Sequence, residues 1–139
     1  MRAGFTMLEL VVVLAVTAVL AGFALPALIG IRDRVTVRLA ATEAQRALAD
    51  ARSVAITSAT RTSVQIDTRT NSLTVVSGTD TLRRLSLAEF GVTLRTTRDS
   101  IAFGPTGIGW GAATATITLS RGRASTALAI SRLGRIRRA

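Results

Sequence analysis

Apolar residues dominate the beginning of the chain, and their spacing then changes twice. The segment from Leu10 to Ile31 carries no charge. Its roughly 22 residues form about 33 Å of α-helix, which matches a bilayer hydrocarbon core of about 30 Å. A removable secretory signal has a shorter apolar core, with its cleavage site after that core. We therefore expect one retained helix that crosses a membrane.

From Arg32 the pattern becomes that of an amphipathic helix. Apolar residues recur at alternating spacings of four and three, which places them in one stripe along a helix. The stripe consists of Val37, Ala41, Ala44, Leu48, Ala51 and Ala55, widened by Ala40, Ala47 and Val54. The helix is expected to continue to about Ser58. Its alanine-rich face allows a sheet to approach closely, so we interpret the stripe as core.

Beyond Ser58 the sequence changes to short segments typical of β-strands, separated by turn-forming residues. The predicted strands are 62–67, 73–76, 82–87, 92–95, 100–103, 114–119 and 125–130. The last two are joined by a hairpin turn over 120–123. The sequence therefore predicts an α+β fold, in which one long N-terminal helix packs on a mainly antiparallel sheet.

Composition excludes several kinds of chemistry. The chain has no cysteine and no histidine, which rules out disulfides, a thiol nucleophile, a histidine base and the usual zinc sites. The eight acidic residues are scattered. We therefore predict that the protein is not an enzyme and holds no metal or cofactor.

The segment Gly104–Gly111 is rich in glycine. It lacks the Gly-Lys-Ser/Thr sequence of a phosphate-binding loop, and no predicted helix follows it. We expect a flexible loop between strands. Trp110 within this loop is either an exposed contact with a partner or a lid on the core.

All basic residues are arginines, because the chain has no lysine. The formal net charge is +10, from 18 basic and 8 acidic residues. Arginines scattered over a solvated surface account for this charge, and composition favours that interpretation. The alternative is an anionic partner such as nucleic acid or lipid headgroups.

The C-terminal segment concentrates this charge, since no acid follows Asp99. In an extended chain Arg135 and Arg137 point to one face, about 7 Å apart. Guanidinium groups so placed can bind phosphates bidentately. A solvated tail and contacts with anionic neighbours remain alternatives. The arginines concerned are Arg121, Arg123, Arg132, Arg135, Arg137 and Arg138.

The N-terminus carries the most specific motif, Gly4-Phe5-Thr6-Met7-Leu8-Glu9 after the basic leader Met1-Arg2-Ala3. It resembles the class III signal of type IV pilins and type II secretion pseudopilins at every position. The resemblance implies cleavage between Gly4 and Phe5 by a prepilin peptidase/methyltransferase, which also methylates the new Phe5 amine. It makes Glu9 the fifth residue of the mature chain, the position of the family's glutamate. An ordinary signal anchor with a chance glutamate is the alternative.

Glu9 has a physical role whatever the family. A carboxylate at the start of a membrane helix is costly and either protonates or finds a cation. The Phe5 amine of the same chain or of a neighbouring subunit can supply that cation. We hypothesise the intersubunit pair, which makes Glu9 a filament-assembly residue.

Gly22 and Pro26 weaken the membrane helix. Proline cannot donate to the carbonyl four residues earlier, and glycine is a poor helix former. We expect a bend or a partly melted segment there. The family's filaments show such segments, and a continuous helix in a single chain is compatible with this expectation.

The second half resembles the GspH/FimT branch of the pilin superfamily. The resemblance rests on Phe103-Gly104-Pro105-Thr106-Gly107, the strand 114–119, and Ile130-Ser131 followed by Gly134-Arg135-Ile136-Arg137. The acidic calcium loop of major pseudopilins is missing, which indicates a minor subunit. The implied organisation is a leader (1–4), the transmembrane half of the helix (5–31) and a globular domain (32–139, with helix 32–58 and sheet 62–138).

The resemblance implies a single-pass protein of the bacterial inner membrane, with its C-terminal domain in the periplasm or in a surface filament. By charge alone, Arg32, Arg34 and Arg38 after the helix argue for the opposite orientation, but the leader must face a cytoplasmic peptidase. The expected function is a minor pseudopilin or pilin, a structural subunit of a type II secretion or type IV pilus filament. It would assemble with other pilin subunits at or near the tip.

Two alternatives remain. One is a minor pilin that binds double-stranded DNA during natural transformation. Its candidate residues are Arg135, Arg137, Arg138, Arg121 and Arg123. The other is a membrane-anchored module that does not assemble.

Overall fold

The computed structural model describes residues 6–111 and 113–139. Its single α-helix, α1 (Met7–Thr57), has 51 residues and ends one residue before the predicted limit. The chain divides into two compact units, one ending at Arg32 and the other covering Asp33–Ala139. The predicted cleavage residues Gly4 and Phe5 lie outside the described residues.

The N-terminal unit is an apolar helix with exposed side chains. It is long and apolar enough to cross a membrane, and none of its most apolar window is buried. The Thr6 hydroxyl accepts a hydrogen bond from the Glu9 backbone N–H at 3.2 Å. Thr6 therefore caps the helix, and Glu9 occupies the third helical position, where acidic residues stabilise the positive end of the helix dipole.

In this single chain, α1 is continuous through the predicted break at Gly22 and Pro26. A break at these residues in an assembled filament stays a prediction.

The predicted helical stripe is confirmed as core. Val37 is 2% exposed, and the alanines and the leucine of the stripe are fully buried. Of the three residues that widen the stripe, Ala40 and Ala47 are also fully buried, whereas Val54 is half-buried. Alanine along this face lets the sheets approach the helix backbone closely.

The strands form two antiparallel sheets rather than the single sheet that we predicted. The first sheet has the order β3-β2-β1-β5-β6 and the second has the order β4-β7-β8-β9. The strands of the first sheet are β1 (Thr62–Asp67), β2 (Ser72–Ser77), β3 (Asp80–Ser86), β5 (Ser100–Phe103) and β6 (Gly109–Trp110). Those of the second are β4 (Thr93–Thr96), β7 (Ala115–Arg121), β8 (Ala124–Ile130) and β9 (Ile136–Arg138). A short 3-10 helix, η1 (Ala88–Phe90), precedes β4.

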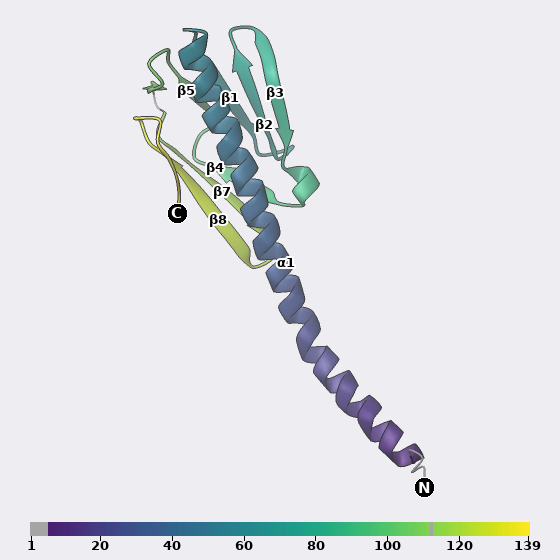
Figure 1. Cartoon of the computed structure of the whole chain (residues 1–139). Helices are drawn as coiled ribbons and strands as arrows, with labels where there is room; N and C mark the ends of the chain where they lie inside the picture. Colours follow the sequence, from purple (N-terminus) through teal and green to yellow (C-terminus); the bar gives the residue numbers. More distant parts are fainter. Residues whose placement is uncertain (1–5, 112) are drawn as a thin grey trace. The chain divides into compact units, whose positions relative to one another are not determined.

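Both sheets pack on the same helix and share one core. In the unit from Asp33 onward, α1 crosses both sheets, with β1–β3 on one side and β7–β8 on the other (Figure 1). The buried cluster joins Leu48 of the helix with Phe103 of the first sheet and Leu119 of the second. Because the core is continuous, neither sheet is an independent folding unit.

The turn between β1 and β2 is organised by two polar side chains. Asp67 accepts hydrogen bonds from the backbone N–H groups of Arg69 and Thr70 at 2.8 and 3.1 Å. The hydroxyl and backbone N–H of Thr70 lower the pKa of this carboxyl below its usual 3.8. Asn71 accepts from the Leu94 N–H at 2.8 Å, and so connects this turn to β4 of the other sheet.

Candidate functional site

The arginines predicted to bind phosphates lie at two ends of one strand. In β9, Arg137 pairs with Ala129 and Arg138 with Leu128. The β7–β8 turn lies at the opposite end of β8, where Arg121 pairs with Ala124. Leu128 lies four positions after Ala124, which is about 13 Å along a strand. The two groups therefore do not converge on one point.

Arg121 is engaged in contacts within the fold, and its place among the candidate DNA-binding residues stays a prediction. Its Nε donates to Asp33 Oδ1 at 2.9 Å and its Nη1 donates to the Phe90 carbonyl oxygen at 2.6 Å. The Arg121 and Asp33 side chains are 27% and 15% exposed. This ion pair fixes the β7–β8 turn against α1. Gly122 fits there because a Cβ would lie 2.5 Å from Asp33 Oδ2.

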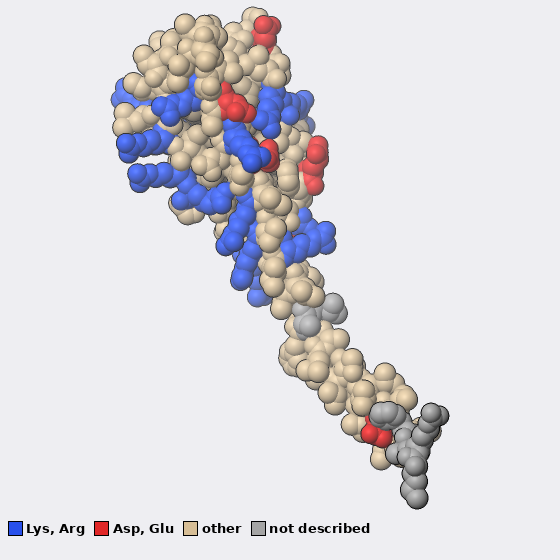
Figure 2. Space-filling model, in the orientation of Figure 1, with Lys and Arg blue, Asp and Glu red and all other residues tan. Residues whose placement is uncertain are grey.

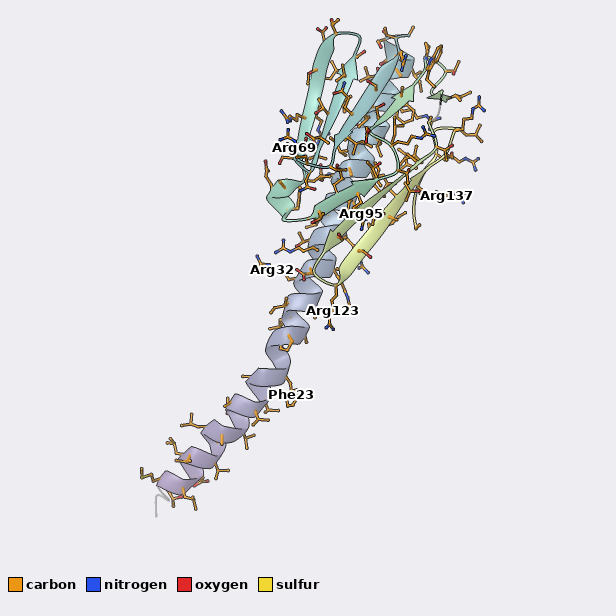
Figure 3. All side chains as sticks on the ribbon, turned by 180° about the vertical axis from the view of Figure 1, so that it is seen from behind. Phe23, Arg32, Arg69, Arg95, Arg123 and Arg137 are labelled. Atoms are coloured by element: carbon orange, nitrogen blue, oxygen red, sulfur yellow. The ribbon has the colours of Figure 1, made fainter. Side chains whose placement is uncertain are left out.

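Arg138 also contacts the helix. Its Nη2 donates to the Thr42 hydroxyl at 3.0 Å, and that hydroxyl donates to the Arg38 carbonyl oxygen at 2.9 Å. This contact places the edge of β9 beside α1. Figure 3 shows Arg123 at the turn end of the hairpin and Arg137 at the far end of the same strands.

A groove of about 540 Å³ lies between α1 and the segment leading into β9. Its lining is Gln45, Ala49, Arg52, Ser53, Ile56, Gly134, Arg135, Ile136 and Arg137. Arg135 and Arg137 are exposed and both line this groove, whereas their binding of phosphate stays a prediction. We call this surface the tail groove.

Arg52 anchors the tail groove, a role that spacing does not predict because Arg52 lies outside the core stripe. Its Nε donates to the Gly107 carbonyl oxygen at 2.9 Å, and its Nη1 to that of Gly134 at 3.4 Å. The two glycines belong to the two motifs noted in the second half of the chain. One guanidinium thus connects both motifs to α1. Arg135 is the residue that directly follows the anchored Gly134 in the sequence.

A second groove, of about 330 Å³, lies at the turn end of the same flank. It is lined by Arg34, Val37, Arg38, Arg123, Ala124, Ser125 and Thr126. The sequence marked Arg123 as a candidate but treated Arg34 and Arg38 only as charges that flank the membrane helix. We call this surface the turn groove.

Two acidic side chains of α1, Glu43 and Asp50, pair with arginines away from both grooves. Arg83 of β3 donates to Asp50 at 2.8 Å and to Glu43 at 3.4 Å, and Arg46 pairs with Glu43 at 2.6 Å. Figure 2 shows arginines gathered along the flank that carries β8. In residues 6–111 and 113–139, no three acidic side chains converge as ligands for a metal ion.

Trp110 is exposed and is not a lid on the core, whereas its contact with a partner stays a prediction. It is 57% exposed and stands beside Gly104, whose added Cβ would lie 3.1 Å from the indole ring. Ile108 and Leu133 are also exposed, at 45% and 62%. The Gly109 N–H donates to the Arg132 carbonyl oxygen at 2.8 Å, so the two loops lie side by side. We call Ile108, Trp110 and Leu133 the loop patch.

One long N-terminal helix on antiparallel sheets, opening with an apolar helix long enough for a membrane, defines a pilin-like protein. The family profile of the type II transport protein GspH matches residues 40–134, and the prokaryotic N-terminal methylation motif matches residues 1–25. The chain belongs to the GspH family. No curated protein sequence matches this chain.

Solved structures support the same fold. The type IV minor pilin FimU of Pseudomonas aeruginosa PAO1 superposes with a TM-score of 0.64 at 20% identity, covering 75% of this chain and 88% of FimU. The minor pseudopilin EpsH from the type 2 secretion system of Vibrio cholerae gives 0.62 at 17% identity, covering 74% and 95%. These likenesses show the fold, and the family profile and methylation motif make the protein a pilin-like member of the family of the type II transport protein GspH. Its family consists of structural subunits and not of enzymes.

Proposed function

We propose that the protein is processed between Gly4 and Phe5, anchored in the bacterial inner membrane through residues 5–31, and assembled at or near the tip of a filament. The match of the methylation motif to residues 1–25 supports the processing step. A prepilin peptidase needs a residue without a side chain beside the bond that it cleaves, and Gly4 supplies one. Residues 32–139 then form the periplasmic or filament-borne domain.

Glu9 is the assembly residue in this proposal. It lies in the first turn of α1, at the edge of a segment that suits lipid, where a carboxylate needs a compensating cation. The methylated Phe5 amine of a neighbouring subunit supplies that cation. Assembly is thereby restricted to positions where the two charges meet.

The loop patch supports a place at the tip. Ile108, Trp110 and Leu133 expose apolar surface on two adjoining loops. Arg52 and Ile56, from the last turns of α1, lie against Gly107 of the same loops. This is the end of the helix farthest along the chain from the membrane segment. Exposed apolar patches of this kind mark contacts with other proteins, and we assign this one to another tip subunit.

Mass spectrometry and filament incorporation test the proposal together. Protein purified from membranes of cells with a working prepilin peptidase should begin with methylated Phe5. Glu9→Ala should be processed normally but should be absent from sheared filaments, whereas Glu9→Asp should retain some incorporation. An intact Met1, or normal incorporation of Glu9→Ala, would contradict the assignment.

A second function, binding of double-stranded DNA, is supported by the tail groove. Both Arg135 and Arg137 are exposed and line it. Arg137 belongs to β9 and Arg135 directly precedes this strand, whose position is fixed by Arg52 and by the Arg138–Thr42 contact. A fixed array of guanidinium groups suits phosphates of a duplex backbone, which are read without regard to sequence. Arg123 lies at the other end of the flank. It would contact the same duplex only if the duplex runs along β8.

The test is the salt dependence of duplex binding by the full mature chain in detergent micelles. Arg135→Gln, Arg137→Gln and Arg138→Gln should each reduce the slope of log affinity against log salt by about one, because each removes a phosphate contact. Arg69→Gln is the matched control, because Arg69 is exposed and lies on the opposite side of the domain from Arg137 (Figure 3). Equal losses for all four variants would mean that general basicity, and not the tail groove, binds DNA.

A further inference from the structure

We propose that the turn groove binds the phosphate of an anionic lipid headgroup at the membrane surface. The inference rests on the proposed membrane anchor. It assigns a ligand to Arg34, Arg38 and Arg123, which take no part in the tail groove. The ligand class is a phosphodiester or phosphomonoester carried on a glycerolipid, such as phosphatidylglycerol.

The chemistry of the turn groove suits a single phosphate. Arg34 and Arg38 are one helical turn apart on α1, and Arg123 approaches from the β7–β8 turn. All three are exposed, and within residues 6–111 and 113–139 none of them forms an ion pair. Ser125 and Thr126 also line the groove, and its lining contains no acid.

The nearest acid does not cancel this charge. Asp33 precedes Arg34 in the chain, but its carboxylate accepts from Arg121 at 2.9 Å. That ion pair holds the β7–β8 turn against α1 and thereby holds Arg123 opposite Arg34 and Arg38. The Asp33–Arg121 pair is therefore a positioning element for the turn groove.

The strand that lines the turn groove also has an open edge. β9 pairs with β8 only from Leu128 to Ile130, and Ala139 adds one hydrogen bond to the Ala127 carbonyl oxygen. The described chain places no strand beside residues 124–126 on that side. Unpaired backbone N–H groups of an edge strand are donors for an anion as well as for another strand.

The position of the arginines along the chain identifies the source of the phosphate. Arg34 is three residues beyond the end of the apolar segment at Ile31 and Arg38 is seven, which corresponds to about 4.5 and 10 Å along a helix. The headgroup layer adds about 5–7 Å on each side of the hydrocarbon core. The backbone of Arg34 therefore falls within the headgroup layer and that of Arg38 a few Å beyond it, from where a long side chain reaches back to the headgroups.

The apolar residues next to these arginines also indicate that this part of the helix lies at the membrane surface. Val35 and Leu39 are 50% and 55% exposed, although they lie beyond the membrane segment. They follow Arg34 and Arg38 directly, so each turn of the helix carries one cationic and one exposed apolar side chain. Helices with such paired faces lie at the boundary between headgroups and acyl chains. A duplex gains nothing from Val35 and Leu39, which favours lipid over nucleic acid at this groove.

The experiment uses the full mature chain in nanodiscs of phosphatidylcholine mixed with phosphatidylglycerol, and native mass spectrometry counts the lipids that stay bound on release. We expect phosphatidylglycerol to be enriched over its share of the disc. Arg34→Gln, Arg38→Gln and Arg123→Gln should each reduce this enrichment about fivefold, the effect of one interfacial basic residue. Arg69→Gln and Arg137→Gln are matched controls that should retain it. Melting temperatures of all variants show that the fold is kept.

Added probes separate the sources of phosphate. Inorganic phosphate or a short duplex that displaces phosphatidylglycerol in an arginine-dependent way would identify a free-phosphate or a nucleic-acid site and overturn the lipid assignment. No enrichment, or enrichment that the three groove variants leave intact, would also overturn it. Glu9→Ala distinguishes this inference from filament assembly, because it should lose incorporation and keep the bound lipid. The triple groove variant should show the reverse: normal processing and incorporation with no lipid enrichment.

Discussion

A Cβ atom on Gly134 would lie 2.5 Å from the carbonyl oxygen of Gly107. The two glycines are far apart in sequence, and both have left-handed backbones, with φ of +73° and +71°. Arg52 donates to both carbonyl oxygens. One side chain of α1 thus holds the two loops together. This contact positions the arginines that follow Gly134 in the C-terminal segment.

Gly134→Ala should destabilise the protein by more than about 1 kcal/mol, because the backbone is left-handed and the new methyl group meets backbone. Denaturant midpoints in mild detergent measure this effect. Gly78→Ala is the control, since Gly78 has φ of +60° and open space around it. Equal costs for the two substitutions would show that the contact with Gly107 adds nothing to the ordinary strain.

Arg52→Ala should lower the free energy of unfolding by about 1–3 kcal/mol, because the carbonyl groups of Gly107 and Gly134 lose a charged hydrogen-bond donor. Arg52→Lys keeps the charge but replaces the planar fork by a single ammonium group, so it should recover only part of the stability. DNA binding at the tail groove should weaken with both variants if the anchor positions Arg135. Stability equal to wild type in Arg52→Ala would show that the loops hold each other without the helix.

Leu48→Ala should lower the free energy of unfolding by on the order of 2–5 kcal/mol. Leu48 is fully buried where α1 packs on the sheets, and the smaller alanine leaves a cavity. Chemical denaturation of the full chain measures the loss. Leu82→Ala, on β3 and 49% exposed, should change stability by less than about 0.5 kcal/mol. Similar midpoints for both variants would mean that the helix face is wrongly assigned.

Arg121→Gln should lower the melting temperature more than Asp33→Asn, because Arg121 loses both the carboxylate and the Phe90 carbonyl oxygen. A double-mutant cycle between the two residues should give a coupling energy on the order of 1 kcal/mol, modest because the pair is partly exposed. A DNA-contact residue would behave differently, with unchanged stability and weaker binding. That outcome would support Arg121 as a DNA-binding residue.

Asp67 should make the β1–β2 turn sensitive to acid. Its pKa is lowered in the folded protein, so the ionised carboxylate stabilises the fold at pH values above the unfolded pKa, near 4. This contribution is lost as the pH falls through the lower folded pKa. Asp67→Asn should therefore be less stable at neutral pH and should lose less stability on acidification than the wild type. Parallel pH profiles for the two proteins would contradict this assignment.

The long elements of the fold could be predicted because they repeat a period. The helical stripe through Leu48 and the strand pairs around 62–77 and 115–130 follow from spacing alone. β6 and β9 have two and three residues, which is too short for any periodic signal. The division into two sheets was also missed, because alternation marks a strand and does not specify its neighbour.

The arginines show why the candidate site was harder to predict. Sequence shows where positive charge is concentrated but not which guanidinium groups are already occupied. Arg121 and Arg123 are two residues apart in one turn, yet Arg121 is bound to Asp33 and Arg123 lines an open groove. Arg52 looked like a surface residue because its partners are backbone carbonyls of distant loops, which leave no mark in the local pattern.

The way both sheets are attached to one helix has a mechanical consequence. Arg83 joins β3 to Asp50 and Glu43, and on the other flank Arg121 joins the β7–β8 turn to Asp33. A force applied along α1 would load these side-chain contacts in shear at the same time, because they lie on opposite flanks of the same rod. The domain should therefore resist extension as a unit, and rupture in a pulling experiment should appear as one event and not as the successive release of two sheets.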